Sequence, residues 1–196
     1  MNKLNSKQLR DISISKAQDY SKSVNRKPLY FILENIYDTY NIGGLFRLAD
    51  ALAVSKIYLC GEIETPPNHK IIKASVGTYK IVPWEYCRSA VEVIAKLRKT
   101  HNAQRVSQKT QKETLHVTRL ALHVYAIEQS KDSIPYTKAE YRMPLALVVG
   151  NETYGVTKET LKEVDQIVEI PMWGVNRSLN VIVSAAIVGY HAINSE

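Results

Sequence analysis

Short apolar runs separated by amphipathic stretches occupy most of the chain. Runs of four to seven mostly apolar residues predict strands at 29–34, 56–60, 80–83, 121–127, 144–149 and 166–170. Helical spacing between them predicts helices at 42–53, 68–75, 86–99, 157–164 and 178–193. This alternation indicates an α/β fold, a mostly parallel sheet with helices on both faces. Such sheets bind ligands outside the carboxyl ends of their strands, so the loops that follow the strands are the first place to look for a site.

Two segments have a weaker pattern. Residues 5–23 have spacing compatible with one amphipathic helix, which Pro28 would close. Residues 100–120 contain many amides and few apolar anchors, and they are interpreted as either a helical extension or a mobile loop. At 196 residues the chain fits one folded domain over 29–196, preceded by an N-terminal extension over 1–28.

The net charge of +7 is concentrated in two segments. Residues 1–28, the N-terminal basic segment, carry seven Lys/Arg against two Asp, and residues 88–120, the second basic segment, carry eight Lys/Arg against two Glu. Clustered cations are typical of a surface that neutralises the phosphates of a nucleic acid. The alternative is that both segments are solvated basic surfaces without a partner.

Composition also excludes some classes of protein. No apolar run approaches the roughly 18–20 residues that span a bilayer. The first residues lack the apolar stretch of a secretory signal, so a cytoplasmic location is expected. Cys60 and Cys87 are isolated from each other and from histidines in the sequence, which predicts two buried thiols and no metal site.

Polar side chains gather where three of the predicted strands end. The first cluster runs from Glu34 and Asn35 to Arg47, with Asn41 as a candidate helix cap and Arg47 about a turn and a half inside the helix. Judged from this cluster alone, Arg47 is better explained as a surface or ion-paired arginine than as a functional one. The cluster therefore marks a candidate site without defining its chemistry.

The second cluster is Val149 to Val156, a strand that enters a turn containing Gly150 and Gly155. These glycines permit close approach of a ligand, but the phosphate-binding and dinucleotide-binding glycine patterns are both absent. The third cluster runs from Ile170 to Val181. Ser178 is a candidate cap of the last helix there, and Asn180 could point its amide at a ligand.

In this order the three clusters resemble the motifs of the SpoU/TrmH RNA 2′-O-ribose methyltransferases of the SPOUT superfamily. The matching patterns are Asn-x-Gly-x-x-x-Arg, Val-x-Gly-x-Glu-x-x-Gly and Ile-Pro-Met-x-Gly-x-x-x-Ser-Leu-Asn-Val, and the likeness covers about residues 29–194. The resemblance implies a methyltransferase domain over 29–196 whose C-terminal part forms a deep trefoil knot, and it implies a homodimer. The expected cofactor is S-adenosylmethionine, the product S-adenosylhomocysteine, and the expected substrate RNA, with tRNA slightly favoured over rRNA.

The resemblance also implies roles for individual residues. Arg47 corresponds to the catalytic arginine, and the polar site around it would comprise Asn35, Asn41, Glu152, Ser178 and Asn180. The cofactor would be held by Val149, Gly150, Asn151, Gly155, Ile170, Pro171, Met172, Gly174, Ser178, Leu179 and Val181. No metal is expected. Because a guanidinium stays protonated at ordinary pH, we expect Arg47 to orient the hydroxyl and a phosphate that takes the proton.

One departure from the family pattern and two other functions need consideration. Ala53 stands where the family usually has glycine, which is harmless if its φ is negative. The main alternative function is a non-catalytic RNA-binding module of the same fold. A small-molecule α/β enzyme that uses another nucleotide is a further alternative.

Overall fold

The structure is a computed structural model that describes residues 3–109 and 121–195, with the side chains of 103–109 left out. Its centre is a sheet in which every strand pairing is parallel, in the order β3-β2-β1-β6-β4-β7-β5. The strands are β1 (Lys27–Glu34), β2 (Val54–Cys60), β3 (Trp84–Cys87), β4 (His123–Ile127), β5 (Ile134–Pro135), β6 (Leu145–Val149) and β7 (Gln166–Glu169). The expected α/β fold is confirmed.

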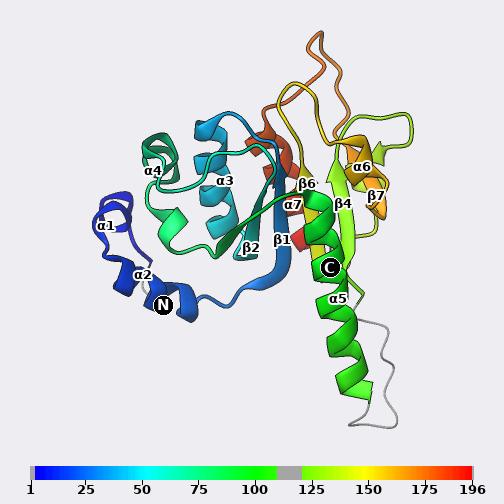
Figure 1. Cartoon of the computed structure of the whole chain (residues 1–196). Coiled ribbons are helices and arrows are strands. Elements are labelled where there is room, and N and C mark those ends of the chain that lie inside the picture. Colours follow the sequence, from blue (N-terminus) through cyan, green and yellow to red (C-terminus); the bar gives the residue numbers. More distant parts are fainter. Residues whose placement is uncertain (1–2, 110–120, 196) are drawn as a thin grey trace.

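Helices cover both faces of the sheet (Figure 1). They are α1 (Ser6–Asp11), α2 (Ile14–Ser23), α3 (Thr39–Ala51), α4 (His69–Ser75), α5 (Ala90–Lys109), α6 (Lys158–Leu161) and α7 (Val181–Asn194), with short 3-10 helices η1 (Thr78–Lys80) and η2 (Tyr136–Lys138). No helix in the described ranges is long and apolar enough to cross a membrane.

Alternation along β1 separates the two cores. Phe31 and Leu33 pack with residues of α3 and α7, whereas Ile32 points to the opposite face and packs with residues of α5. All three side chains are at most 2% exposed, as expected for a central parallel strand. On the first face, α3 lies between α4 and α7. A Cβ at Gly43 would collide with Ala74 of α4, and a Cβ at Gly44 would collide with Ile182 of α7.

The N-terminal segment forms two helices instead of the single helix predicted for 5–23. Asn5 caps α1 in a capping box with Gln8, and the Ser13 side chain caps α2. Because Ser13 begins a new helix, α1 ends at Asp11 and the two helices are separate. The prediction that Pro28 closes this helix was also wrong, since α2 ends at Ser23 and Pro28 lies in β1. Lys80 ties the segment to the domain by donating to the carbonyls of Arg10 and Ile12, both at 3.0 Å.

The structure contradicts two further predictions and agrees with the helical alternative for part of 100–120. The run 80–83 is not a strand, because the chain first turns through η1 and pairs with β2 only from Trp84. The stretch 100–109 belongs to α5, while residues 110–120 lie outside the described residues. Ala53 has a φ of +51°, so the expectation of a negative φ was wrong and this alanine occupies a left-handed conformation.

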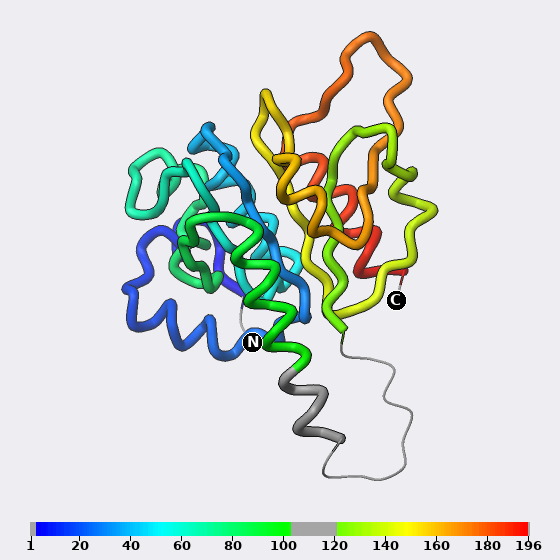
Figure 2. Tube along the Cα trace, turned by 45° about the vertical axis from the view of Figure 1, so that its right-hand side comes forward, coloured from blue at the N-terminus to red at the C-terminus, as the bar shows by residue number. Residues whose placement is uncertain are grey.

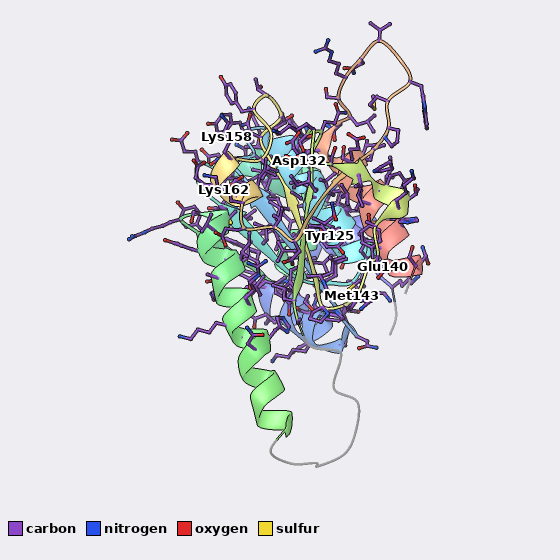
Figure 3. All side chains as sticks on the ribbon, turned by 90° about the vertical axis from the view of Figure 1, so that its right-hand side faces the viewer. Tyr125, Asp132, Glu140, Met143, Lys158 and Lys162 are labelled. Atoms are coloured by element: carbon purple, nitrogen blue, oxygen red, sulfur yellow. The ribbon has the colours of Figure 1, made fainter. Side chains whose placement is uncertain are left out.

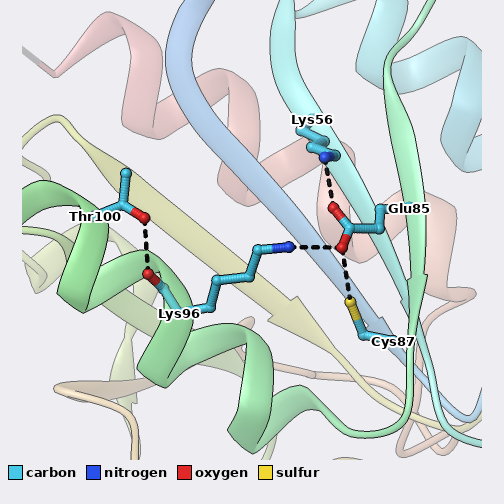
Figure 4. A network of polar contacts seen from close by, with 5 residues as sticks. All are labelled: Lys56, Glu85, Cys87, Lys96 and Thr100. Atoms are coloured by element: carbon cyan, nitrogen blue, oxygen red, sulfur yellow. Dashed lines mark hydrogen bonds and ion pairs between the residues drawn. The ribbon is translucent and has the colours of Figure 1, made fainter.

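The edge strand β3 carries an ion-pair network (Figure 4). The Glu85 carboxylate accepts hydrogen bonds from Lys56 and Lys96, both at 2.6 Å, and these bonds lower the pKa of Glu85 to about 2. Cys87 donates to the same carboxylate at 3.8 Å. Cys60 is buried as predicted, but Cys87 is only half-buried because it lies on this edge strand. Burial raises the pKa of both thiols.

The two ends of the sheet receive different parts of the chain. The loops after β1, β6 and β7 lie at the carboxyl end, and α5 runs from that end past the amino end of the sheet (Figures 1 and 2). Figure 3 shows the connection from β4 to β6 descending from Asp132 to Met143. It is held to the sheet by the Tyr125 hydroxyl, which donates to the Glu140 carbonyl at 2.7 Å.

Candidate active site

A pocket of about 430 Å³ opens where β4, β6 and β7 end. Its size is within the roughly 300–1,000 Å³ typical of small-molecule sites. Its position agrees with the rule that open parallel sheets bind ligands at the carboxyl ends of their strands. The lining residues are Ile127, Glu128, Gln129, Val149, Gly150, Asn151, Glu152, Thr153, Gly155, Glu169, Ile170, Met172, Asn176, Arg177, Ser178, Leu179, Asn180, Val181 and Ser184.

The turn after β6 forms one wall of the pocket. Asn151 is buried there; its side-chain amide donates to the Asn35 carbonyl at 2.7 Å, and its Oδ1 accepts from the backbone of Thr153 and Tyr154. The turn closes by backbone hydrogen bonds between Asn151 and Gly155. Gly155 has a φ of +70°, and a Cβ there would overlap the Glu128 carboxylate. Only glycine fits this position without strain.

A chain of hydrogen bonds joins the three sequence clusters. Asn41 donates its amide to Glu152 at 2.9 Å and accepts at Oδ1 from the Asn180 amide, also at 2.9 Å. Glu152 in addition accepts from the backbone of Tyr37 and Asp38, both at 3.2 Å. Residues 139 positions apart are thereby held one hydrogen bond from each other, and Asn41, 6% exposed, is the centre of this polar network.

Two capping predictions were wrong in detail. Asp38 caps α3 through its bond to the backbone of Tyr40, so Asn41 lies inside the first turn. Asn180 caps α7 by accepting from the backbone of Ile182. Ser178 lines the pocket and lies before the helix, where its backbone N–H donates to Asn176. Because α7 starts at residue 181, the side chain that reaches its free N–H groups is that of Asn180.

Asn35 and Arg47 lie outside the pocket wall. Asn35 has a φ of +53°, and its side chain accepts from the backbone of Glu62 at 2.8 Å. It therefore holds neighbouring loops in place. Arg47 is exposed, more than two turns into α3 instead of about a turn and a half, and makes no hydrogen bond or ion pair with any described residue.

Most of the residues assigned to the cofactor line the pocket. They are Val149, Gly150, Asn151, Gly155, Ile170, Met172, Ser178, Leu179 and Val181. Pro171 and Gly174 do not line it, although both belong to the loop between β7 and α7. Gly174 is in open space, with no atom within 4 Å of a Cβ placed there.

The match to a known family extends over most of the chain. The sequence profile of the SpoU rRNA Methylase family matches residues 28–190. This chain belongs to the SpoU family.

Individual relatives agree with this membership. The tRNA (guanosine(18)-2′-O)-methyltransferase of Thermus thermophilus is 28% identical over 168 residues, 85% of this chain and 75% of that enzyme. The 23S rRNA (guanosine-2′-O-)-methyltransferase RlmB of Vibrio parahaemolyticus is 27% identical over 85% of this chain and 59% of its own length. The fold matches the crystal structure of the SpoU methyltransferase AviRb from Streptomyces viridochromogenes in complex with AdoMet. That match has a TM-score of 0.71 at 23% identity and covers 88% of this chain and 62% of AviRb.

Two carboxylates stabilise the loops around this SpoU site, and the sequence alone assigned neither of them a role. Glu34, 4% exposed at the end of β1, accepts from the Thr157 backbone and hydroxyl and from the Thr160 hydroxyl, the last at 2.6 Å. Glu128 lines the pocket and accepts from the backbone of Val156 at 2.8 Å. Their position at the end of an apolar strand was a usable signal, but their partners lie 28 and more residues away and have no local pattern.

Proposed function

We propose that this chain transfers a methyl group from S-adenosylmethionine to a ribose 2′-hydroxyl of RNA, with tRNA slightly favoured over rRNA. The observation that carries the proposal is the junction of Glu152, Asn41 and Asn180 beside a pocket of ligand size. Each of the three residues comes from a different motif of the family. The names of the relatives, which act on tRNA and on 23S rRNA, support an RNA substrate and leave both classes of RNA open.

The pocket fits S-adenosylmethionine by its chemistry. Apolar side chains such as Ile127, Val149 and Leu179 suit the faces of an adenine ring, and the glycine turn leaves backbone groups accessible to its polar edge. The carboxylates of Glu128 and Glu169 suit a ligand that carries positive charge. When bound, S-adenosylmethionine supplies an electrophilic methyl group on a sulfonium. The protein holds the reacting groups in place and excludes water from them.

Arg47 is assigned to the substrate side of the reaction. In-line transfer to a hydroxyl depends chiefly on alignment, so side chains that fix the ribose contribute most of the rate gain. A protonated guanidinium donates to a hydroxyl and to an adjacent phosphate, which then accepts the hydroxyl proton. Asn41, Glu152 and Asn180 hold the loops that face this ribose in one arrangement.

The proposal includes a cytoplasmic homodimer with its active sites near the subunit interface, and a deep trefoil knot in the C-terminal part. Arg47 does not line the pocket of a single chain, which favours a site completed at an interface. Apolar side chains beside the pocket are also exposed, Trp173 by 93% and Val183 of α7 by 44%. Light scattering of the purified chain tests the dimer. A monomer that is active at nanomolar concentration would contradict it.

RNA would be bound by cations that form no ion pair within the described part of the chain. The structure changes which cations these are. Arg26 donates to the carbonyls of Val54 and Ile81, and Lys96 and Arg98 form ion pairs with carboxylates. Lys16, Lys22 and Lys27 are exposed and have no ion pair within the described ranges. We assign the phosphate contacts of the N-terminal basic segment to these three lysines.

Methyl incorporation tests the proposed function directly. The chain is incubated with S-adenosylmethionine labelled in its methyl group and with tRNA or rRNA from cells that lack this protein. We expect label in one RNA class, at a nucleotide that resists alkaline hydrolysis because its 2′-oxygen is blocked. Binding of RNA and cofactor without any incorporation would instead support the non-catalytic RNA-binding module.

A further inference from the structure

Two exposed tyrosines that do not line the pocket lie on loops at its rim: Tyr154 stands between the lining residues Thr153 and Gly155, and the Tyr37 backbone bonds to the lining residue Glu152. Tyr37 lies between β1 and α3 and is 55% exposed; Tyr154 lies in the turn after β6 and is 83% exposed. β1 and β6 are paired strands, so their loops meet at the carboxyl end. The contact is direct, because the Tyr37 backbone donates to Glu152, two residues before Tyr154.

Both tyrosines are carried on fixed backbone. The turn that holds Tyr154 is closed by Asn151, which accepts from the Tyr154 backbone at 3.0 Å. The Tyr37 hydroxyl donates to Glu62 at 3.0 Å, which also restrains the ring. This hydrogen bond and the charge of Glu62 raise the pKa of Tyr37.

The ring faces are free to take a partner. Neither ring stacks on another ring in the part of the chain that the structure describes. Carboxylates of Asp38 and Glu152 lie on the same two loops, and Glu62, on the loop after β2, accepts from the Tyr37 hydroxyl; these three carboxylates would repel a phosphate. A neutral planar group therefore fits this rim better than the RNA backbone does, because it can cover the rings without bringing negative charge.

We propose that Tyr37 and Tyr154 form a stacking platform for an unpaired nucleobase of the RNA. This inference rests on the proposed function, since a ribose presented to the pocket brings its own base to the rim. Unpaired bases expose both faces, and proteins that bind single-stranded RNA stack them on aromatic side chains. Every base has such a face, so the platform selects for an unpaired nucleotide and not for one base identity.

The test compares alanine and phenylalanine at the same two positions. Tyr37→Ala and Tyr154→Ala remove the ring, whereas Tyr37→Phe and Tyr154→Phe keep it and remove only the hydroxyl. Tyr86→Ala, on the edge strand and 50% exposed, is the matched control. The measurements are kcat and KM for unmodified tRNA, the Kd of S-adenosylhomocysteine by calorimetry, the melting temperature and the mass in light scattering.

Each alanine variant at the rim should raise the KM for RNA about tenfold, as expected for the loss of one base stack. The phenylalanine variants and Tyr86→Ala should stay within twofold of the wild type, and the Kd of S-adenosylhomocysteine should not change. An unchanged KM, an equal loss in the phenylalanine variants, or a change in oligomeric mass instead of in KM would overturn the platform alone. A wild-type chain that methylates no RNA would overturn the proposed function, and the platform with it.

Discussion

The two ends of the sheet are built differently. At the carboxyl end, strand-end loops enclose a pocket and are tied together by buried side chains such as Glu34, Asn41 and Asn151. At the amino end, the N-terminal helices carry exposed lysines such as Lys16 and Lys22, and α5 extends beyond the sheet (Figure 1). The carboxyl end is thus organised by buried hydrogen bonds between its loops, whereas the amino end presents exposed lysines without an ion pair in the described ranges.

Distance separates the electrostatics of these two ends. β1 has eight residues, so it extends over about 26 Å at roughly 3.3 Å per residue. The Debye length at physiological salt is only about 8 Å, and cations at the amino end are therefore screened from the pocket. They can hold an RNA by contact, but they do not tune the chemistry at the other end. The following changes test this division of roles.

Arg47→Ala should have the largest effect. Arg47 belongs to neither basic segment, and in the proposal it contacts the reacting ribose. Loss of a positioned donor at a reacting group should lower kcat at least about 100-fold, with little change in cofactor affinity or melting temperature. Single-turnover methylation and calorimetry with S-adenosylhomocysteine measure the two effects. Arg142→Ala, at an exposed arginine whose ion pair among the described residues is with Glu140, is the control and should be fully active. Near-normal turnover of Arg47→Ala would contradict its role.

Glu34→Gln should weaken the carboxyl end itself. The carboxylate accepts three hydrogen bonds from Thr157 and Thr160, and an amide nitrogen cannot replace one of its acceptor oxygens. A buried donor left without its acceptor costs about 1–3 kcal/mol in the free energy of unfolding. Urea denaturation measures this loss. Glu140→Gln, at an exposed glutamate, should change the free energy of unfolding by less than about 0.5 kcal/mol. An equal loss in both variants would show that the buried hydrogen bonds of Glu34 add no particular stability.

Removing the exposed positive charges at the amino end should weaken RNA binding without changing cofactor binding. The triple variant Lys16→Ala, Lys22→Ala and Lys27→Ala should weaken tRNA binding about tenfold and leave cofactor affinity unchanged. The slope of log affinity against log salt should become shallower by about 0.7–0.9 for each lost phosphate contact. A second variant, Arg105→Ala with Lys109→Ala, tests the second basic segment in the same way; Lys112 lies outside the described residues. If both sets bind RNA with unchanged affinity and slope, these cations are solvated surface and the division of roles is wrong.

Ala53→Gly tests a strained position at the amino end of β2. Alanine with a φ of +51° is disfavoured by about 1 kcal/mol, whereas glycine adopts this conformation freely. The substitution should therefore raise the free energy of unfolding by up to about 1 kcal/mol, with activity unchanged. Ala53→Val provides the opposite test, because a β-branched side chain at positive φ should destabilise the protein. If the glycine variant is less stable than the wild type, the positive φ of Ala53 does not destabilise the protein.

Sequence reasoning worked where the signal was local. The buried strands β1, β2 and β6 contain short, mostly apolar runs, and the ends of these runs identify the loops that form the site. It failed where long-range packing decides. The pattern at 80–83 could not show that η1 intervenes before the edge strand, and the helix-start signals of Ser178 and Asn41 were indistinguishable from those of Asn180 and Asp38.

The distribution of charge was visible in the sequence, but its placement was not. Counting cations could not reveal that Arg26 is committed to backbone carbonyls or that Lys96 is committed to Glu85. These partners lie 11 to 55 positions away and meet only through the order of strands in the sheet. The same holds for Asn41, whose two partners come from the other two clusters.

Lys96 and Lys99 on α5 give the smallest and most discriminating test. Lys96 pairs with Glu85, while Lys99 is exposed and has no ion pair within the described ranges. The folded pKa of Glu85, about 2, lies below its ordinary value of 4.5, so its contribution to stability is present above about pH 4.5 and is lost as the pH falls towards 2. Lys96→Ala should reduce the free energy of unfolding by less than about 1 kcal/mol at pH 6, because both side chains are partly exposed, and by nothing near pH 2.

Lys99→Ala should leave stability unchanged at every pH and make the salt slope of RNA binding shallower, which Lys96→Ala should not do. If the two variants exchange these effects, the cations that hold RNA are not the unpaired ones.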